Sequence, residues 1–231
     1  MPPTASLSPE EDPVAAAKVA MRTQIRAARR QQRSDGGDSA RDDDAQAITR
    51  AGMQWLAQHT RDHGPVRCVT AYESMANEPP TGQFVEALRA QGLRVLVPIT
   101  LPHGELRWRD ADPEVSSHPM GAAVDETTGP TWGEEILGEV DVAFIPALAI
   151  REDGARLGQG GGYYDRAIPA LRSTPRTSMS GAPATGAPVI GVVYASELRA
   201  DVPTHAHDIR VDAVLTPGAV RPITPLGPAP A

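Results

Sequence analysis

The stretch with the clearest chemical potential is a glycine-rich run at residues 156–166, Arg-Leu-Gly-Gln-Gly-Gly-Gly-Tyr-Tyr-Asp-Arg. Four of the five residues 158–162 are glycine, so their main-chain N–H groups can approach a ligand closely. A helix predicted to begin at Tyr163 would add the positive end of its dipole, which favours a bound phosphate. The run lacks the Lys-Ser/Thr ending of a P-loop and the third glycine of a dinucleotide fingerprint, so a merely flexible turn stays the alternative. Arg156 could neutralise phosphate charge, and Asp165 could hold a divalent ion.

Three other places carry side chains of the types that bind ligands. Lys18 and Arg22 are four residues apart on a predicted helix, so both cations lie on one side of it, as a triphosphate would require. Taken singly, these cations are more typical of a solvated helix face than of a ligand site. Glu78 precedes two prolines and Asp208 precedes a predicted strand, and each alone is more typical of a turn than of a ligand contact. Only the combination of the four places favours a binding site.

Alternating apolar runs and helical segments predict how these residues are positioned. The rhythm is that of a single α/β domain, residues 14–220, with a mostly parallel sheet flanked by helices. Ligands bind at the carboxyl ends of the strands in such sheets, so the loop after the apolar run 140–150 is the expected site. The predicted strands are residues 66–72, 93–99, 105–109 (a short edge strand), 140–150, 189–194 and 211–216, and the predicted helices are residues 14–33, 45–59, 82–91 and 163–171, with a Gly- and Asp-rich gap at 34–44.

Three segments are expected to lie outside the packed domain. Residues 1–13 form a predicted disordered leader, residues 173–188 a low-complexity and flexible surface insertion, and residues 221–231 a proline-rich disordered tail. We assign no role to the gap at 34–44 or to the insertion.

Composition excludes several classes of protein. The formal net charge is -7, which argues against a protein that mainly grips a nucleic-acid backbone. The single cysteine, Cys68, excludes an internal disulfide. No apolar stretch approaches the roughly 18 residues of a membrane span, and the amino terminus is not typical of a signal peptide, so we expect a cytoplasmic protein with no membrane partner.

The sequence resembles the 5-formyltetrahydrofolate cyclo-ligase family in four places that occur in the family's order. These are the run 156–165, the Lys-x-x-x-Arg pair Lys18 and Arg22, the segment 72–81 with Glu78, and the segment 207–212 followed by Leu-Thr. Together they span about residues 17–216. The resemblance implies the fold shared by sugar-phosphate isomerases and CoA transferases. It also implies an ATP- and Mg²⁺-dependent closure of 5-formyltetrahydrofolate to 5,10-methenyltetrahydrofolate, with release of ADP and phosphate. We expect a monomer.

The resemblance also implies roles for individual residues. Lys18, Arg22 and Arg156 would be catalytic, through offsetting charge on the triphosphate, and Asp165 and Asp208 would hold Mg²⁺. ATP would be bound by Lys18, Arg22, Arg156, Leu157, Gly158, Gln159, Gly160, Gly161, Gly162, Tyr163 and Tyr164. The formyl-folate would be bound by Glu73, Glu78, Gln159, Gly160, Gly161, Gly162 and Tyr163.

The sequence departs from the family pattern in two places. Residues 146–154 replace a typical Pro-Gly-x-Ala-Phe-Asp run, so the entrance of the loop is expected to differ in shape. Gln159 and Gly161 stand where some relatives carry Arg or Lys, and we therefore expect weaker nucleotide binding. Two alternatives stay open: an isomerase or CoA-transferase-like enzyme of the same fold, and a folate-binding protein without turnover.

Overall fold

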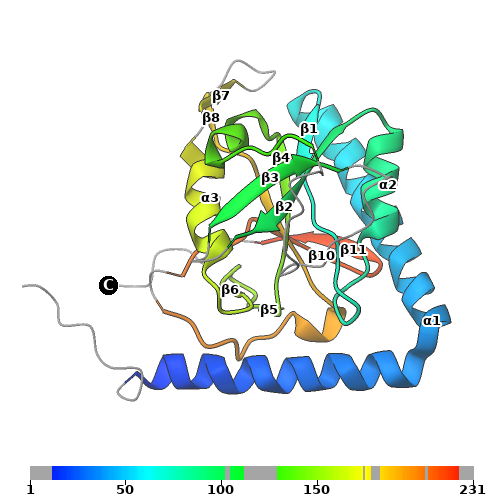
Figure 1. Ribbon diagram of the computed structural model, residues 1–231, viewed down its shortest axis with the longest axis vertical. Helices are drawn as coiled ribbons and strands as arrows, with labels where there is room; N and C mark the ends of the chain where they lie inside the picture. The colour runs from blue at the N-terminus through cyan, green and yellow to red at the C-terminus, as the bar shows by residue number, and fades with distance from the viewer. Residues whose placement is uncertain are drawn as a thin grey trace, which may run out of the picture.

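A seven-stranded sheet forms the centre of the molecule in the computed structural model (Figure 1). The structure describes residues 12–101, 105–111, 129–173, 175–177, 183–205 and 208–223. The strands are β1 (Cys68–Thr70), β2 (Arg94–Thr100), β3 (Leu106–Asp110), β4 (Val142–Pro146), β9 (Val189–Val192), β10 (Ala213–Thr216) and β11 (Ala219–Pro222). Their order is β11-β10-β9-β4-β1-β2-β3, in which the five inner strands are parallel and the two edge strands antiparallel. The predicted α/β class with a mostly parallel sheet is confirmed.

Helices cover both faces of this sheet, as Figure 1 shows. Strand β4 is buried at every position because its side chains alternate between two apolar layers. Phe144 packs edge-on against Phe84 of α2 (Gly82–Ala90), in a cluster that also contains Ile48 from α1 (Pro13–His63). Ile145 points the other way, into a cluster with Ile168 of α3 (Tyr163–Ser173) and residues of the 3-10 helix η2 (Glu134–Glu139).

The amino-terminal helix differs from the prediction. Two helices separated by a non-helical gap at 34–44 were expected, but helix α1 continues through that gap and departs from helical geometry only at Gly37, with φ 64° and ψ -159°. A left-handed φ suits glycine, which has no Cβ to clash. Across the bend, Arg33 forms an ion pair of 2.5 Å with Asp38. The polar composition therefore marks a bend and an exposed face, and the second half of α1 turns to run beside the sheet (Figure 1).

The apolar run 140–150, predicted as one strand, is divided. After β4, the two residues of β5 (Ala149–Ile150) leave the main sheet and pair antiparallel with β6 (Arg156–Leu157), the strand that leads into the glycine run. Pro146 ends β4 because proline has no N–H to donate to a neighbouring strand. The Leu148 N–H instead donates to Leu157 O at 2.8 Å, which fixes the start of the small hairpin.

The prediction for the carboxyl-terminal end of the domain needs correction. Strand β11 was missed, although Gly218 with φ 111° makes the tight turn that joins it to β10. It runs to Pro222, so the first two residues of the predicted tail lie in a strand, while residues 224–231 lie outside the described part. Strands β7 (Pro175–Thr177) and β8 (Pro183–Thr185) pair within the predicted insertion. Residues 1–11 of the predicted leader also lie outside the described part. Across the described ranges, no helix has the length and apolarity needed to cross a membrane.

Candidate active site

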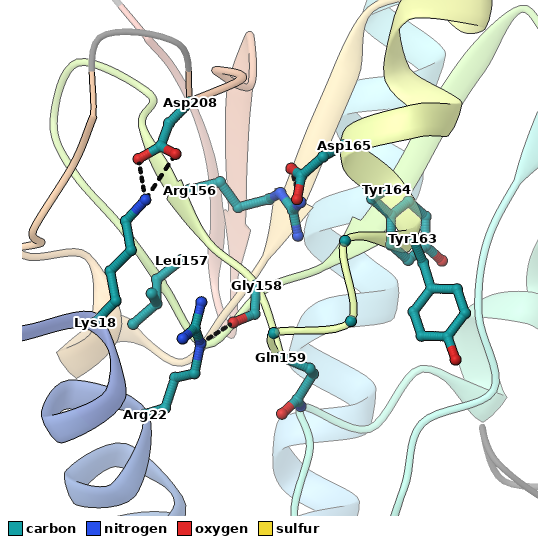
Figure 2. Close-up of a pocket in the computed structure, with 13 residues that line it drawn as sticks. Lys18, Arg22, Arg156, Leu157, Gly158, Gln159, Tyr163, Tyr164, Asp165 and Asp208 are labelled. Carbon is teal, nitrogen blue, oxygen red and sulfur yellow. Dashed lines mark hydrogen bonds and ion pairs between the residues drawn. The ribbon is translucent and has the colours of Figure 1, made fainter. Parts of the chain in front are cut away.

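The glycine run forms a loop between β6 and the start of α3. Gly160 and Gly162 have φ values of 107° and 67°, a backbone conformation that side chains with a Cβ rarely adopt. The side chain of Arg22 donates from Nε to Gly158 O at 3.0 Å, so α1 contacts the beginning of the loop (Figure 2). The sequence requirement for glycine here is therefore one of backbone geometry as well as space.

Two cations predicted to bind phosphate extend from α1, Arg22 toward the glycine loop and Lys18 toward Asp208, as Figure 2 shows. Lys18 Nζ donates to both carboxylate oxygens of Asp208, at 2.7 Å and 2.6 Å, and contacts His205 Nδ1 at 3.0 Å. Arg22 is partly buried, and burial, followed by the neighbouring charge of Arg26, lowers its pKa. A cation that is desolvated beside another cation is stabilised by an arriving anion.

Arg156 is the most buried of the predicted cations, with a side chain only 4% exposed. Its Nη2 donates to Asp165 Oδ1 at 2.7 Å, and its guanidinium lies 5.8 Å from the centre of the Tyr164 ring. Among the described residues, its buried Nε has no hydrogen-bond partner. Because its partner Asp165 is 56% exposed, the positive charge of Arg156 is only partly compensated. The Arg156 guanidinium can therefore bind a further anion.

These residues line one hollow, with an empty volume of about 570 Å³ that is continuous with solvent. The lining comprises every residue predicted to bind ATP and both predicted metal ligands: Lys18, Arg22, Arg156, Leu157, Gly158, Gln159, Gly160, Gly161, Gly162, Tyr163, Tyr164, Asp165 and Asp208.

The two predicted metal ligands lie in this hollow but each already pairs with a cation (Figure 2). Desolvation, the largest influence, raises the pKa of Asp208, but hydrogen bonds from Lys18 and from the His205 N–H outweigh it, so the net pKa lies below its usual value. Within the described ranges, no group of three or more His, Cys, Asp or Glu side chains could hold a metal by itself. This donor set fits Mg²⁺ carried by a phosphate ligand, because that ion commonly takes one or two carboxylates and completes its shell with phosphate and water.

Glu78 lies beside the hollow in the loop that follows β1, and is 3% exposed. Its Oε2 accepts from the Met75 N–H at 3.0 Å, and its Oε1 accepts from Gln159 Nε2 at 3.0 Å. The glycine loop is thus joined directly to the predicted folate-binding carboxylate. The Glu73 side chain forms an ion pair of 3.2 Å with Arg109 of β3, and Glu73, like Glu78, does not line the hollow itself, so its contact with folate stays a prediction.

Sequence reasoning missed Arg26, which lies at the mouth of this site. Its Nη2 donates to Gln159 O at 2.8 Å and to Gln159 Oε1 at 3.0 Å. Arg26 thus places a further cation beside Gln159 of the glycine loop. The available signal was the continuation of the four-residue spacing from Lys18 and Arg22 to Arg26. His205 was also missed: its Nε2 contacts Asp12 Oδ2 at 2.9 Å, a link between distant segments that no local pattern indicates.

Comparisons with known proteins agree with this geometry. The model of the 5-formyltetrahydrofolate cyclo-ligase family matches residues 14–217. The 5-formyltetrahydrofolate cyclo-ligase of Mycolicibacterium smegmatis is 32% identical over 210 residues, which cover 85% of this chain and 93% of that protein.

Two solved structures share the fold. The NMR structure of Aquifex aeolicus 5,10-methenyltetrahydrofolate synthetase superposes with a TM-score of 0.66 at 18% identity, covering 93% of this chain and 96% of that one. The 5,10-methenyltetrahydrofolate synthetase from Mycoplasma pneumoniae superposes with a TM-score of 0.58 at 22% identity, covering 86% and 97%. On the family match over residues 14–217 and the close relative, this chain belongs to the 5-formyltetrahydrofolate cyclo-ligase family.

Proposed function

We propose that the protein is an ATP-dependent 5-formyltetrahydrofolate cyclo-ligase, which converts 5-formyltetrahydrofolate to 5,10-methenyltetrahydrofolate and releases ADP and phosphate. Family membership supports the reaction. The single observation that carries it is the hollow in which three cations meet a glycine loop that is hydrogen-bonded, through Gln159, to the buried carboxylate of Glu78. A phosphate-binding surface and a carboxylate suited to pterin N–H groups therefore lie side by side.

The chemistry that this site would support is activation of a poor leaving group. The formyl oxygen attacks the γ-phosphorus of ATP, and the bond from that phosphorus to ADP breaks. N10 of the folate then attacks the formyl carbon and loses its proton, the carbon–oxygen bond to phosphate breaks, and the imidazoline ring closes. Because an amide-like oxygen is a weak nucleophile, the protein contributes mainly alignment and charge compensation.

Each cation has a distinct part in that compensation. Lys18 and Arg22 would exchange their contacts with Asp208 and Gly158 O for phosphate oxygens, and Arg156 would turn its unmatched charge toward the transferred group. Main-chain N–H groups of residues 158–162 would hold the remaining oxygens. Asp165 and Asp208 would hold Mg²⁺ on the phosphates, where the ion would offset negative charge.

Glu78 would fix the folate by accepting hydrogen bonds from the amino and ring N–H groups of the pterin. Its burial strengthens such bonds, because little water competes for the carboxylate. Tyr163 is half-buried at the edge of the hollow and would pack on the folate, whereas Tyr164 is fully covered beneath Arg156. Tyr163 is therefore the more accessible of the two rings for packing on a bound ligand.

The test is turnover by the purified protein. With MgATP and 5-formyltetrahydrofolate together, we expect the ultraviolet absorbance of methenyltetrahydrofolate to appear, and no product when either substrate is omitted. Binding of formyl-folate without product would support a folate-binding protein, and conversion of a sugar phosphate without ATP would support an isomerase; either result would refute the proposal. The cytoplasmic location and monomeric state are part of the same proposal, and light scattering of the purified protein tests the latter.

A further inference from the structure

We infer that Arg41 is a positioning residue for the folate site, which holds the turn that carries Glu78. The inference rests on the proposed function for the identity of the ligand, although the contacts themselves do not. Arg41 lies in the Asp-rich part of α1, residues 34–44, for which the sequence analysis assigned no role. It does not touch the hollow, so its action would be indirect, through the orientation of Glu78.

Residues 74–78 form a tight turn whose main-chain oxygens converge on the Arg41 guanidinium. Nη1 donates to Ala76 O at 2.8 Å and to Glu78 O at 2.9 Å, while Nη2 donates to Met75 O at 3.2 Å and to Ser74 Oγ at 3.3 Å. One planar, charged fork thus satisfies four acceptors in a turn of five residues. A forked cation can do this where a point charge cannot, because its donors are spread over fixed directions.

The same turn also fixes the orientation of the Glu78 side chain. The Glu78 N–H donates to Met75 O at 3.0 Å, and the Met75 N–H donates back to Glu78 Oε2 at 3.0 Å. The direction of the carboxylate is therefore tied to the main chain that Arg41 holds. Loosening of the turn would free one carboxylate oxygen and let the group rotate away from the position that Gln159 marks at the hollow.

A second donor reaches the same point from elsewhere in the fold. Tyr194 OH donates to Glu78 O at 3.2 Å, and the Tyr194 N–H donates to Glu197 Oε2 at 2.9 Å. Glu197 forms a buried ion pair with Arg29, with contacts of 2.7 Å and 2.8 Å. The main-chain carbonyl of Glu78 is thus held from both sides.

These contacts come from the two halves of α1, before and after the bend at Gly37. Arg41, in the second half, contacts the Glu78 turn directly. Arg29, in the first half, lies 5.7 Å from the centre of the Tyr194 ring and pairs with Glu197, which accepts from the Tyr194 N–H. The two halves of α1 therefore brace one residue, and the polar 34–44 segment acquires a function.

The experiment compares Arg41→Met, Tyr194→Phe and a control, Arg30→Met, in the full-length protein. Arg30 is exposed on the same helix and makes no side-chain hydrogen bond or ion pair among the described residues. Dissociation constants are measured separately for 5-formyltetrahydrofolate and for a non-hydrolysable ATP analogue, alongside the melting temperature. We expect Arg41→Met to weaken folate binding about 10- to 100-fold, the usual cost of losing a contact that orients a ligand-binding group. Binding of the ATP analogue should change less than about twofold, because Arg41 does not line its site.

Tyr194→Phe removes one hydroxyl and keeps the ring, so it should weaken folate binding by a smaller factor with the same selectivity, and it tests the inference even if Arg41→Met fails to fold. Arg30→Met should behave as wild type. The inference is overturned if either variant lowers the melting temperature while folate affinity stays at the wild-type value, or if both ligands weaken equally. Absence of turnover in the wild-type protein refutes the proposed function instead, and the binding constants then still decide the role of Arg41.

Discussion

Replacing Arg156 with methionine should separate catalysis from stability. The wild-type guanidinium is buried, its Nε has no partner among the described residues, and its one ion pair is to an aspartate that is 56% exposed. A buried charge with incomplete compensation does not favour folding, and an apolar side chain of similar length often replaces it without loss. The partner left behind, Asp165, is more than half exposed and water can hydrate it, so loss of the ion pair should cost less than about 1 kcal/mol.

We therefore expect Arg156→Met to melt within a few degrees of the wild type or above it. Its kcat/KM should nevertheless fall about 100- to 1,000-fold, since removal of one oriented donor to developing charge costs about 2.7–4 kcal/mol. Activity is followed by the absorbance of methenyltetrahydrofolate and melting by circular dichroism. A variant that melts far below the wild type yet keeps most of its activity would refute this reasoning, because Arg156 would then be structural.

Three further predictions concern the loop, the metal and acid stability. Asp165→Asn should raise the Mg²⁺ concentration needed for half-maximal activity several-fold, with activity partly recovered at high Mg²⁺. Gly161→Ala should lower kcat/KM about tenfold or more, because the added methyl would clash with the Tyr163 ring and displace the loop or the ring. The hydrogen bond from Arg151 holds the pKa of buried Asp153 far below its usual range. Ionised Asp153 therefore stabilises the fold fully above about pH 4, the pKa of an unfolded aspartate. This contribution is lost as the pH falls from there through the lower pKa of the folded state. Urea unfolding of Asp153→Asn should accordingly depend less on pH under acidic conditions.

The sheet could be predicted because its strands carry their own signal. Strand β4 is apolar at every position since both of its faces are covered, and the β–α rhythm around it indicates parallel pairing. The hairpin of β5 and β6 could not be foreseen, because two-residue strands are too short to show a period. Helix α1 was misjudged at 34–44, since polar composition alone does not show that only Gly37 leaves the helix.

The site residues also divide into those that the sequence could indicate and those that it could not. Residues close in sequence, such as Arg156 and Asp165, could be associated with the glycine loop by their spacing, and the resemblance brought Lys18 and Asp208 to it. Contacts across the fold could not be inferred. The link from Gln159 to Glu78 spans 81 residues of sequence. It depends on the way in which the loop after β1 meets the loop after β6.

The central claim is that the terminal phosphates of ATP lie on the glycine loop. Crystals of the protein with Mg²⁺ and a non-hydrolysable ATP analogue test it most directly. We predict the β- and γ-phosphates against the main-chain N–H groups of residues 158–162, within hydrogen-bonding distance of Lys18, Arg22 and Arg156. A well-ordered nucleotide bound elsewhere, with this loop and its cations unchanged, would contradict the account.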